Sequence, residues 1–168
     1  PSFPTRRSSD LSREALEEAI ALLEAGTRGF AFASGMAAIT STLLIFSTGD
    51  HLVVCDDVYG GTYRALTGVF SRLGIQSTFV DATSVEAIAA AIRPDTKGIY
   101  LETPSNPLLK VTDLRAVAEL ARAKGIITLV DNTFMTPYLQ RPLELGCDIV
   151  LHSGTKFMSG HSDVICGF

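Results

Sequence analysis

Several features that would place this sequence in a specialised class are missing from it. It has no run of lysines and arginines, and its net charge is -4, which argues against a nucleic-acid surface. The longest apolar stretches, such as Ile126 to Val130, are far too short to span a bilayer, and no signal peptide pattern occurs. No internal repeat or interdomain linker is present. These absences predict a cytoplasmic protein that binds small molecules, with neither a nucleic acid nor a membrane as a partner.

Disulfide frameworks and metal sites are also poorly supported. The three cysteines, Cys55, Cys147 and Cys166, are an odd number without CxxC spacing, so we expect reduced thiols packed as small hydrophobic groups. The pair Asp56 and Asp57 has no histidine or further carboxylate at ligand spacing. We therefore expect helix capping or solvation from these two aspartates, and no metal.

The composition and the pattern of apolar runs indicate an α/β domain. With 46% hydrophobic and 19% charged residues in 168, the chain resembles an ordinary globular domain. Helical patterns alternate with short apolar runs, which favours parallel strands covered by helices in three layers. The expected helices are 83–92 and 114–123. The expected strands are 29–33, 52–55, 75–80, 98–101, 126–131 and 148–152.

The two ends of the chain are less orderly. Residues 12–25 have helical spacing with Ser12 as a plausible N-cap. Residues 1–11 lack apolar periodicity and resemble a translated sequencing adaptor, so we expect them to be non-native and exclude them from the fold. The sequence stops at Gly167-Phe168 as another strand begins, which predicts a domain cut at its C-terminus.

Loops that follow the strands carry the candidate chemistry, because functional groups of open parallel sheets collect at the carboxyl ends of strands. Gly35 and Met36 open a helix whose free N–H groups suit an anion, although small residues there also serve close packing. Tyr59 precedes paired glycines and is placed either to stack on a planar cofactor or to lie at the surface. Gly74 and Gly125 follow helices as C-terminal breakers.

Three further loops place polar groups after strands. Glu102 and Asn106 lie on a segment stiffened by two prolines. Asp131 directly follows a buried run, where desolvation raises the pKa of a carboxyl unless a cation or donor meets it; an N-cap or Asx-turn is the simpler alternative. Lys156 follows another buried run, and desolvation of its amine would favour a nucleophile.

The segment SGTKFMSGHS around Lys156, with DNTFMTPYLQRPLELGCDIVLHS before it, resembles the cofactor-lysine signature of the Cys/Met-metabolism (trans-sulfuration) enzymes that use pyridoxal 5'-phosphate (PLP). This family includes cystathionine gamma-synthase and the cystathionine gamma- and beta-lyases. The resemblance continues through ASGMAAI, DDVYGGTYR and LETPSNPLLKVTDL and covers roughly residues 13–168. It implies the large domain of the aspartate-aminotransferase-like (type I) fold, truncated at both ends, with 12–168 as part of the PLP-binding domain.

The resemblance also implies roles for individual residues. Lys156 would form the internal aldimine and move protons, Asp131 would pair with the pyridinium nitrogen, and Tyr59 would stack on the ring. The remaining cofactor contacts would come from Gly35, Met36, Ser153 and Thr155 at the phosphate, Asn106 near the ring hydroxyl, and Glu102 and Thr133 as supporting neighbours.

Departures from the family pattern limit what this chain does alone. Relatives carry an N-terminal Tyr and Arg that reach a neighbouring subunit's phosphate site, and a C-terminal Arg that holds the substrate carboxylate. Neither segment occurs here, so we expect the chain alone to be inactive, whereas a full-length relative is expected to be a homotetramer built from dimers.

The family resemblance predicts a reaction that makes or cleaves a carbon–sulfur bond at the beta or gamma carbon of an amino acid. Gly61 stands where methionine gamma-lyase-like members carry cysteine, which favours the cystathionine synthase and lyase branch. O-acetylhomoserine sulfhydrylase and methionine gamma-lyase remain alternatives within the family. A remote alternative is a serine acyl transferase, because Ser153 and Lys156 fit an S-x-x-K pattern, although its partner motifs are absent.

Overall fold

A computed structural model describes residues 8–168 of the chain. Five parallel strands form one sheet in the order β2-β1-β3-β4-β5. The strands are β1 (His51–Cys55), β2 (Gln76–Val80), β3 (Thr96–Glu102), β4 (Ile127–Asp131) and β5 (Ile149–Leu151). The helices are α1 (Ser8–Leu23), α2 (Gly35–Leu43), α3 (Gly60–Gly68), α4 (Val85–Ala91), α5 (Leu114–Lys124) and α6 (Thr136–Leu139), with a 3-10 turn η1 (Phe70–Leu73).

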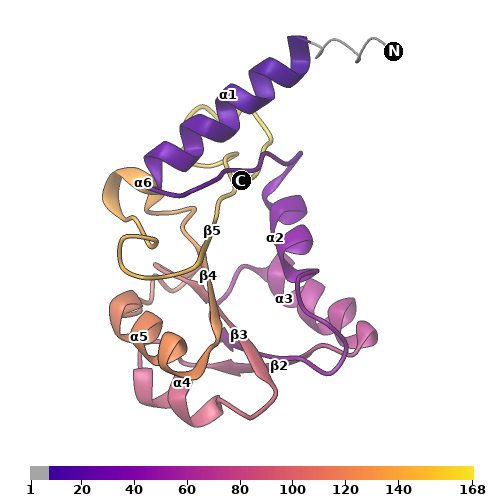
Figure 1. Ribbon diagram of the computed structural model, residues 1–168, viewed down its shortest axis with the longest axis vertical. Coiled ribbons are helices and arrows are strands. Elements are labelled where there is room, and N and C mark those ends of the chain that lie inside the picture. Colours follow the sequence, from indigo (N-terminus) through magenta and orange to yellow (C-terminus); the bar gives the residue numbers. More distant parts are fainter. Residues whose placement is uncertain (1–7) are drawn as a thin grey trace.

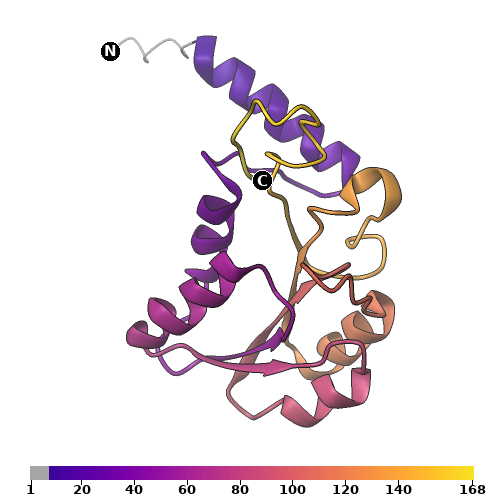
Figure 2. The same ribbon diagram turned by 180° about the vertical axis from the view of Figure 1, so that it is seen from behind.

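Helices cover both faces of the sheet, as the alternation of patterns predicts. Helices α2 and α3 lie on one face, and α4 and α5 lie on the other (Figure 1). The central strands of such a sheet are buried on both sides, which explains why β1 carries the apolar run Leu52–Cys55 and has every residue buried. Turned by 180°, the molecule shows α1 apart from both layers, beside the segment that leads to the C-terminus (Figure 2).

Local chemistry explains where several elements begin and end. Ser34, Ser84 and Asp113 cap α2, α4 and α5, each by accepting a hydrogen bond from the backbone N–H three residues later. Gly74 and Gly125 end η1 and α5 in the left-handed conformation, with φ of 82° and 65°. The breaker roles predicted for these two glycines are confirmed.

One expectation about the N-terminal part is wrong: helix α1 begins at Ser8, so Ser12 lies inside it and is not its N-cap. Residues 1–7 lie outside the described part, and the non-native origin of residues 1–11 stays a prediction. No proline or glycine separates residues 8–11 from the helical pattern, so the helix continues through them.

The strand predicted at 29–33 is also absent from the described structure. Only an isolated bridge forms there, between Phe32 and Gly167, and Gly167 also bridges Ser153 in the antiparallel direction. Phe168 exchanges backbone hydrogen bonds with His152 at 2.9 and 3.0 Å. Residues 29–33 therefore have the apolar character of a strand, but the last two residues of the chain lie between them and the residues that follow β5.

Gly98 on β3 tests how closely β3 packs against Leu52 of β1 and Phe46, which follows α2. A Cβ atom at Gly98 would lie 2.6 Å from Cζ of Phe46 and would also collide with the side chain of Leu52. We expect Gly98→Ala to lower the free energy of unfolding by about 1–3 kcal/mol because the core must shift to admit the methyl group.

Urea denaturation measures this change, and Gly68→Ala is the matched control. A Cβ at Gly68 meets no atom within 4 Å, so this variant should be unchanged or slightly more stable. Equal stabilities of the two variants would contradict the packing described here.

Candidate active site

The parallel register sets two of the predicted carboxylates side by side. Glu102 ends β3, Asp131 ends β4, and their Cα atoms are direct partners in the sheet. Both residues are buried. Because the carboxyl ends of parallel strands share one edge, the loops after β1 and β5 reach the same place.

Glu102 is held by the loop after β1. Its Oε2 accepts a hydrogen bond from the backbone N–H of Tyr59 at 2.7 Å. Burial, reinforced by the charge of Asp131, nevertheless raises the pKa of Glu102 to about 8. A carboxyl in this state can carry a proton near neutral pH.

Asp131 uses one of its two carboxylate oxygens. Its Oδ1 accepts from the backbone N–H of Thr133 at 3.1 Å and from the Thr133 hydroxyl at 2.5 Å, so the Asx-turn considered from the sequence is present. Within residues 8–168 no donor reaches Oδ2. Burial raises the pKa of Asp131, while the Thr133 hydrogen bonds and the charge of His152 act against it. The free oxygen fits a protonated nitrogen of a bound ring.

Thr133 continues this chain of contacts to the loop after β5. The Thr133 hydroxyl accepts a hydrogen bond from the backbone N–H of Ser153 at 2.8 Å. Gly35 packs directly on Ser153, since a Cβ at Gly35 would lie 2.7 Å from the Ser153 Cβ. Only glycine lets the start of α2 approach this closely.

The first turn of α2 is free to bind an anion. Backbone N–H groups of Gly35 and Met36 donate to no residue of the described chain, as expected at a helix N-terminus. Ser153 lies against this turn, whereas the Thr155 hydroxyl is bonded to the backbone of Cys166, at 3.3 Å to its oxygen and 3.2 Å to its nitrogen. The N-terminus of α2 and Ser153 together fit a phosphate group.

Tyr59 lies over Gly61 and next to Met36. A Cβ at residue 61 would collide with the Tyr59 ring and lie 2.7 Å from the Met36 sulfur. A larger residue at this position would displace one of these side chains. The 42% exposure of Tyr59 leaves its ring accessible to a planar ligand.

Lys156 lies in the turn after β5, as predicted, but the desolvation expected from its neighbours does not occur in this structure. Its side chain is exposed, and it lines a cavity of about 550 Å³ together with Phe134, Phe157 and Ile165. The amine is therefore accessible. Asn106 is half-buried and makes no hydrogen bond within the described residues.

Asp56 and Asp57 neither cap a helix nor simply face solvent, so that expectation is wrong. Asp56 forms an ion pair with Lys110 at 3.0 Å, and Asp57 accepts hydrogen bonds from the Ser105 hydroxyl and from the backbone N–H of Leu108. The two aspartates fasten the loop that carries Asn106. Lys110 lies 54 residues from Asp56 in the sequence, so no local sequence pattern predicts this ion pair.

The sequence gives no functional signal for Glu24 or His152, because its patterns place His152 at the end of a strand and Glu24 in the first helix. The structure buries both residues and joins them by a hydrogen bond at 2.6 Å. They line a second cavity, of about 480 Å³, between α1, α2 and β5, which none of the predicted site residues lines.

No group of three or more His, Cys, Asp or Glu side chains is arranged for metal binding within residues 8–168. In the same part of the chain, no helix combines the length and apolar character needed to cross a membrane.

Comparison with known proteins identifies the family. The sequence pattern of the Cys/Met metabolism PLP-dependent enzymes matches residues 2–168. The chain belongs to this family. Its members depend on PLP, so the predicted cofactor and family are confirmed, and the acyl-transferase alternative has no support.

Among its relatives, a cystathionine beta-lyase of Bacillus subtilis is 62% identical over 166 residues, which cover 99% of this chain and 43% of the relative. A cystathionine gamma-lyase of the same organism is 58% identical over 161 residues, or 96% of this chain and 42% of the relative. The crystal structure of cystathionine gamma-lyase from Lactobacillus plantarum, complexed with L-serine, matches with a TM-score of 0.92 and 54% identity, over 93% of this chain and 41% of that one. This family member therefore spans less than half the length of these relatives, and the type I fold is confirmed.

The raised pKa of Glu102 predicts how stability depends on pH. A carboxyl whose pKa is 4.5 when unfolded and about 8 when folded binds its proton more tightly in the folded state, so stability is lost as the pH rises between these values. Glu102→Gln keeps an acceptor for Tyr59 without the charge. We expect this variant to exceed the unmodified chain in free energy of unfolding by at least about 1 kcal/mol at pH 8 to 9.

Urea titrations of both cofactor-free proteins across this pH range are the measurement. The advantage of the variant should shrink as the pH falls toward 4.5. A difference that does not change with pH would show that Glu102 is not a buried carboxyl of raised pKa.

Proposed function

We propose that this chain forms the cofactor-binding core of a PLP-dependent cystathionine lyase, with Lys156 as the residue that bonds the cofactor covalently. The observation that carries the proposal is the buried Asp131 carboxylate. One of its oxygens accepts both hydrogen bonds from Thr133, and the other has no donor within the described residues. The names of the relatives in Bacillus subtilis and Lactobacillus plantarum support the lyase activity.

The residues at this edge of the sheet fit each part of PLP. Asp131 Oδ2 would accept from the protonated ring nitrogen, and the Tyr59 ring would stack on the cofactor. Backbone N–H groups of Gly35 and Met36, with Ser153, would hold the phosphate. Asn106 would lie near the ring hydroxyl, and Glu102, Thr133 and Thr155 would support these contacts.

PLP supplies an electron sink for the pair of electrons left when an amino acid loses its alpha proton. The chain's own residues prepare this chemistry. Asp131 would accept a hydrogen bond from the protonated ring nitrogen and would thereby keep the ring electron-withdrawing. Lys156, whose side chain is exposed beside the cavity it lines, would take the alpha proton and return one farther along the substrate.

Substrate choice within the family is part of the proposal. Gly61 fits beneath Tyr59 and beside Met36, where a cysteine side chain would have to displace one of them. This packing supports a cystathionine enzyme over a methionine gamma-lyase. Cystathionine gamma-synthase and O-acetylhomoserine sulfhydrylase are the other reactions of the family that an assay must distinguish.

We further propose that the parent enzyme is cytoplasmic and assembles as a homotetramer built from dimers. Several large apolar side chains are exposed on the described surface. Contacts with other subunits would bury them, which supports an assembly. These side chains include Leu108, Tyr138, Phe157 and Ile165, with exposed fractions of 67%, 90%, 65% and 74%. We propose that the 168-residue chain alone is inactive on cystathionine, because it spans less than half the length of the relatives it matches.

Covalent trapping tests the assignment of Lys156. Incubation of the chain with PLP, borohydride reduction and peptide mapping should place the pyridoxyl group on Lys156. Lys156→Arg keeps the charge and should reduce trapping at least about tenfold, because an arginine side chain forms no imine here. Lys124→Arg on α5 is the control. Trapping on Lys97, Lys110 or Lys124 in place of Lys156 would overturn the assignment.

The role of Asp131 makes a separate prediction. Asp131→Asn is nearly isosteric, so the PLP should still be trapped on Lys156, but the ring nitrogen should lose its proton at lower pH. Nitrogen-15 NMR of ring-labelled PLP bound to the chain measures this protonation directly. Asp113→Asn serves as the control, because it makes the same change at the N-cap of α5, which is not part of the proposed cofactor site. An unchanged nitrogen shift in Asp131→Asn would refute the pairing.

A further inference from the structure

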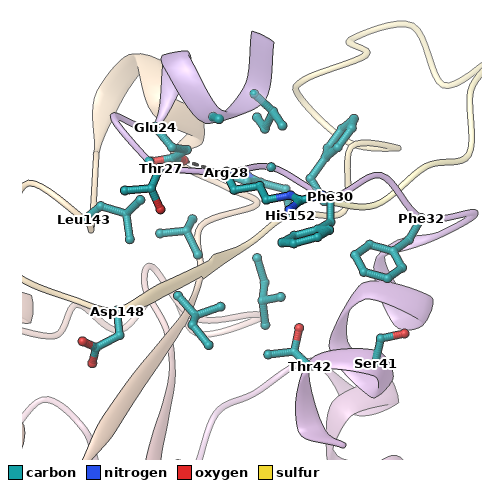
Figure 3. A pocket seen from close by; sticks show the side chains of 18 of the residues that line it. Glu24, Thr27, Arg28, Phe30, Phe32, Ser41, Thr42, Leu143, Asp148 and His152 are labelled. Atoms are coloured by element: carbon teal, nitrogen blue, oxygen red, sulfur yellow. Dashed lines mark hydrogen bonds and ion pairs between the residues drawn. The ribbon is translucent and has the colours of Figure 1, made fainter. Parts of the chain in front are cut away.

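A buried polar cluster lies behind the proposed cofactor site. Glu24, just after α1, and His152, just after β5, are 4% and 2% exposed. The Nε2 of His152 and the Oε1 of Glu24 are 2.6 Å apart. Figure 3 shows this pair joined by a dashed line in the wall of the cavity beneath α1.

The cluster continues from Glu24 to the loops after β3 and β4. The Asn132 side-chain amide donates to Glu24 Oε1 at 2.9 Å and to the backbone oxygen of Gln140 at 2.8 Å. The Gln140 side-chain amide donates to Asn132 Oδ1 at 2.9 Å and to the backbone oxygen of Thr103 at 3.0 Å. One connected set of hydrogen bonds therefore spans the ends of three strands.

Each strand-end member of the cluster is the chain neighbour of a proposed site residue. Thr103 follows Glu102, Asn132 follows Asp131, and His152 precedes Ser153. Glu24 comes from 108 and 128 positions away to reach Asn132 and His152. A rotation of any of these strand ends would therefore strain the hydrogen bonds of the others.

Stability alone does not account for this arrangement. The second oxygen of Glu24, Oε2, and the second ring nitrogen of His152, Nδ1, are buried without a hydrogen-bond partner in the described structure. Buried ion pairs are often no more stabilising than apolar residues of the same volume, and unsatisfied buried polar atoms carry a cost. This cluster combines a buried acid–histidine pair with unsatisfied buried polar atoms, so its role is better explained by the strand ends that it holds in position.

We propose that Glu24 and His152 are positioning residues for Asp131: together with Asn132 and Gln140, they fix the strand end on which the Asp131 carboxylate stands, with the His152 imidazole behind it. This inference rests on the proposed function, in which Asp131 holds the ring nitrogen of PLP. Neither residue is among those proposed to contact the cofactor or the substrate.

The titratable groups around Asp131 come from β1, from β3 and from the residue after β5. Glu102 on β3 is its neighbour in the sheet, and Cys55 on β1 and Tyr100 on β3 also interact with its charge. All three are neutral or negative groups. Burial raises the pKa of Asp131, the two Thr133 hydrogen bonds lower it, and the electrostatic effect of His152 lowers it further. Removal of His152 should therefore raise the pKa of Asp131.

The test uses the 168-residue chain without cofactor. Carbon-13 NMR of the side-chain carboxyl groups follows the titration of Asp131 in the unmodified chain and in His152→Asn. We expect the midpoint for Asp131 to rise by about half a pH unit or more in the variant. Glu24→Gln, which keeps the oxygen acceptor and removes the charge, should shift it in the same direction, because Glu24 contacts His152 and not Asp131.

His51→Asn is the matched control. His51 is also fully buried and bonded to two side chains, Thr96 at 2.7 Å and Thr78 at 2.8 Å, but it lies at the opposite end of β1. This variant should lose stability without moving the Asp131 midpoint. An unchanged midpoint in folded His152→Asn or Glu24→Gln, or an equal shift in the control, would overturn the proposal. If His152→Asn does not fold, Glu24→Gln decides.

The two proposals fail in different ways. The carboxyl titration uses no PLP, so it tests the positioning role even if the chain does not trap the cofactor. Trapping on Lys156 with an unmoved Asp131 midpoint would keep the proposed function and remove the role of Glu24 and His152.

Discussion

The parallel register that places Glu102 beside Asp131 is the constraint on which the rest of this edge depends. Two carboxylates buried at adjacent strand ends cannot both be ionised cheaply, and burial raises the pKa of each. The surrounding loops offset this cost by donating hydrogen bonds to the two carboxylates. Tyr59 supplies its backbone N–H to Glu102, and Thr133 supplies two donors to Asp131.

These donors also connect the site across the sheet. The Thr133 hydroxyl that donates to Asp131 accepts from Ser153, and Ser153 is the surface on which Gly35 packs. The fold itself therefore fixes the spacing between the Asp131 oxygen proposed for the ring nitrogen and the free N–H groups proposed for the phosphate. Such preorganisation costs nothing further when a ligand binds.

Behind this line, the buried cluster of Glu24, His152, Asn132 and Gln140 ties the same strand ends to the end of α1. The front of the edge is accessible, with Tyr59 and Lys156 exposed, whereas Glu24, Asn132 and His152 at the back are buried. A rigid back and an accessible front are what a site needs if its polar groups must keep their positions while a ligand enters.

Local patterns in the sequence determined the five strands of the sheet, the helices α4 and α5, and the glycine breakers, because these depend on periodicity and on the φ angles that only certain residues adopt. The family motifs determined the cofactor and the candidate residues. The tertiary structure alone decided that residues 29–33 form a bridge in place of a strand, because strand formation requires a partner along its length. It also decided the roles of Asp56, which pairs with Lys110, and of Glu24, which pairs with His152, since these partners lie 54 and 128 residues apart and no spacing in the sequence can bring them together.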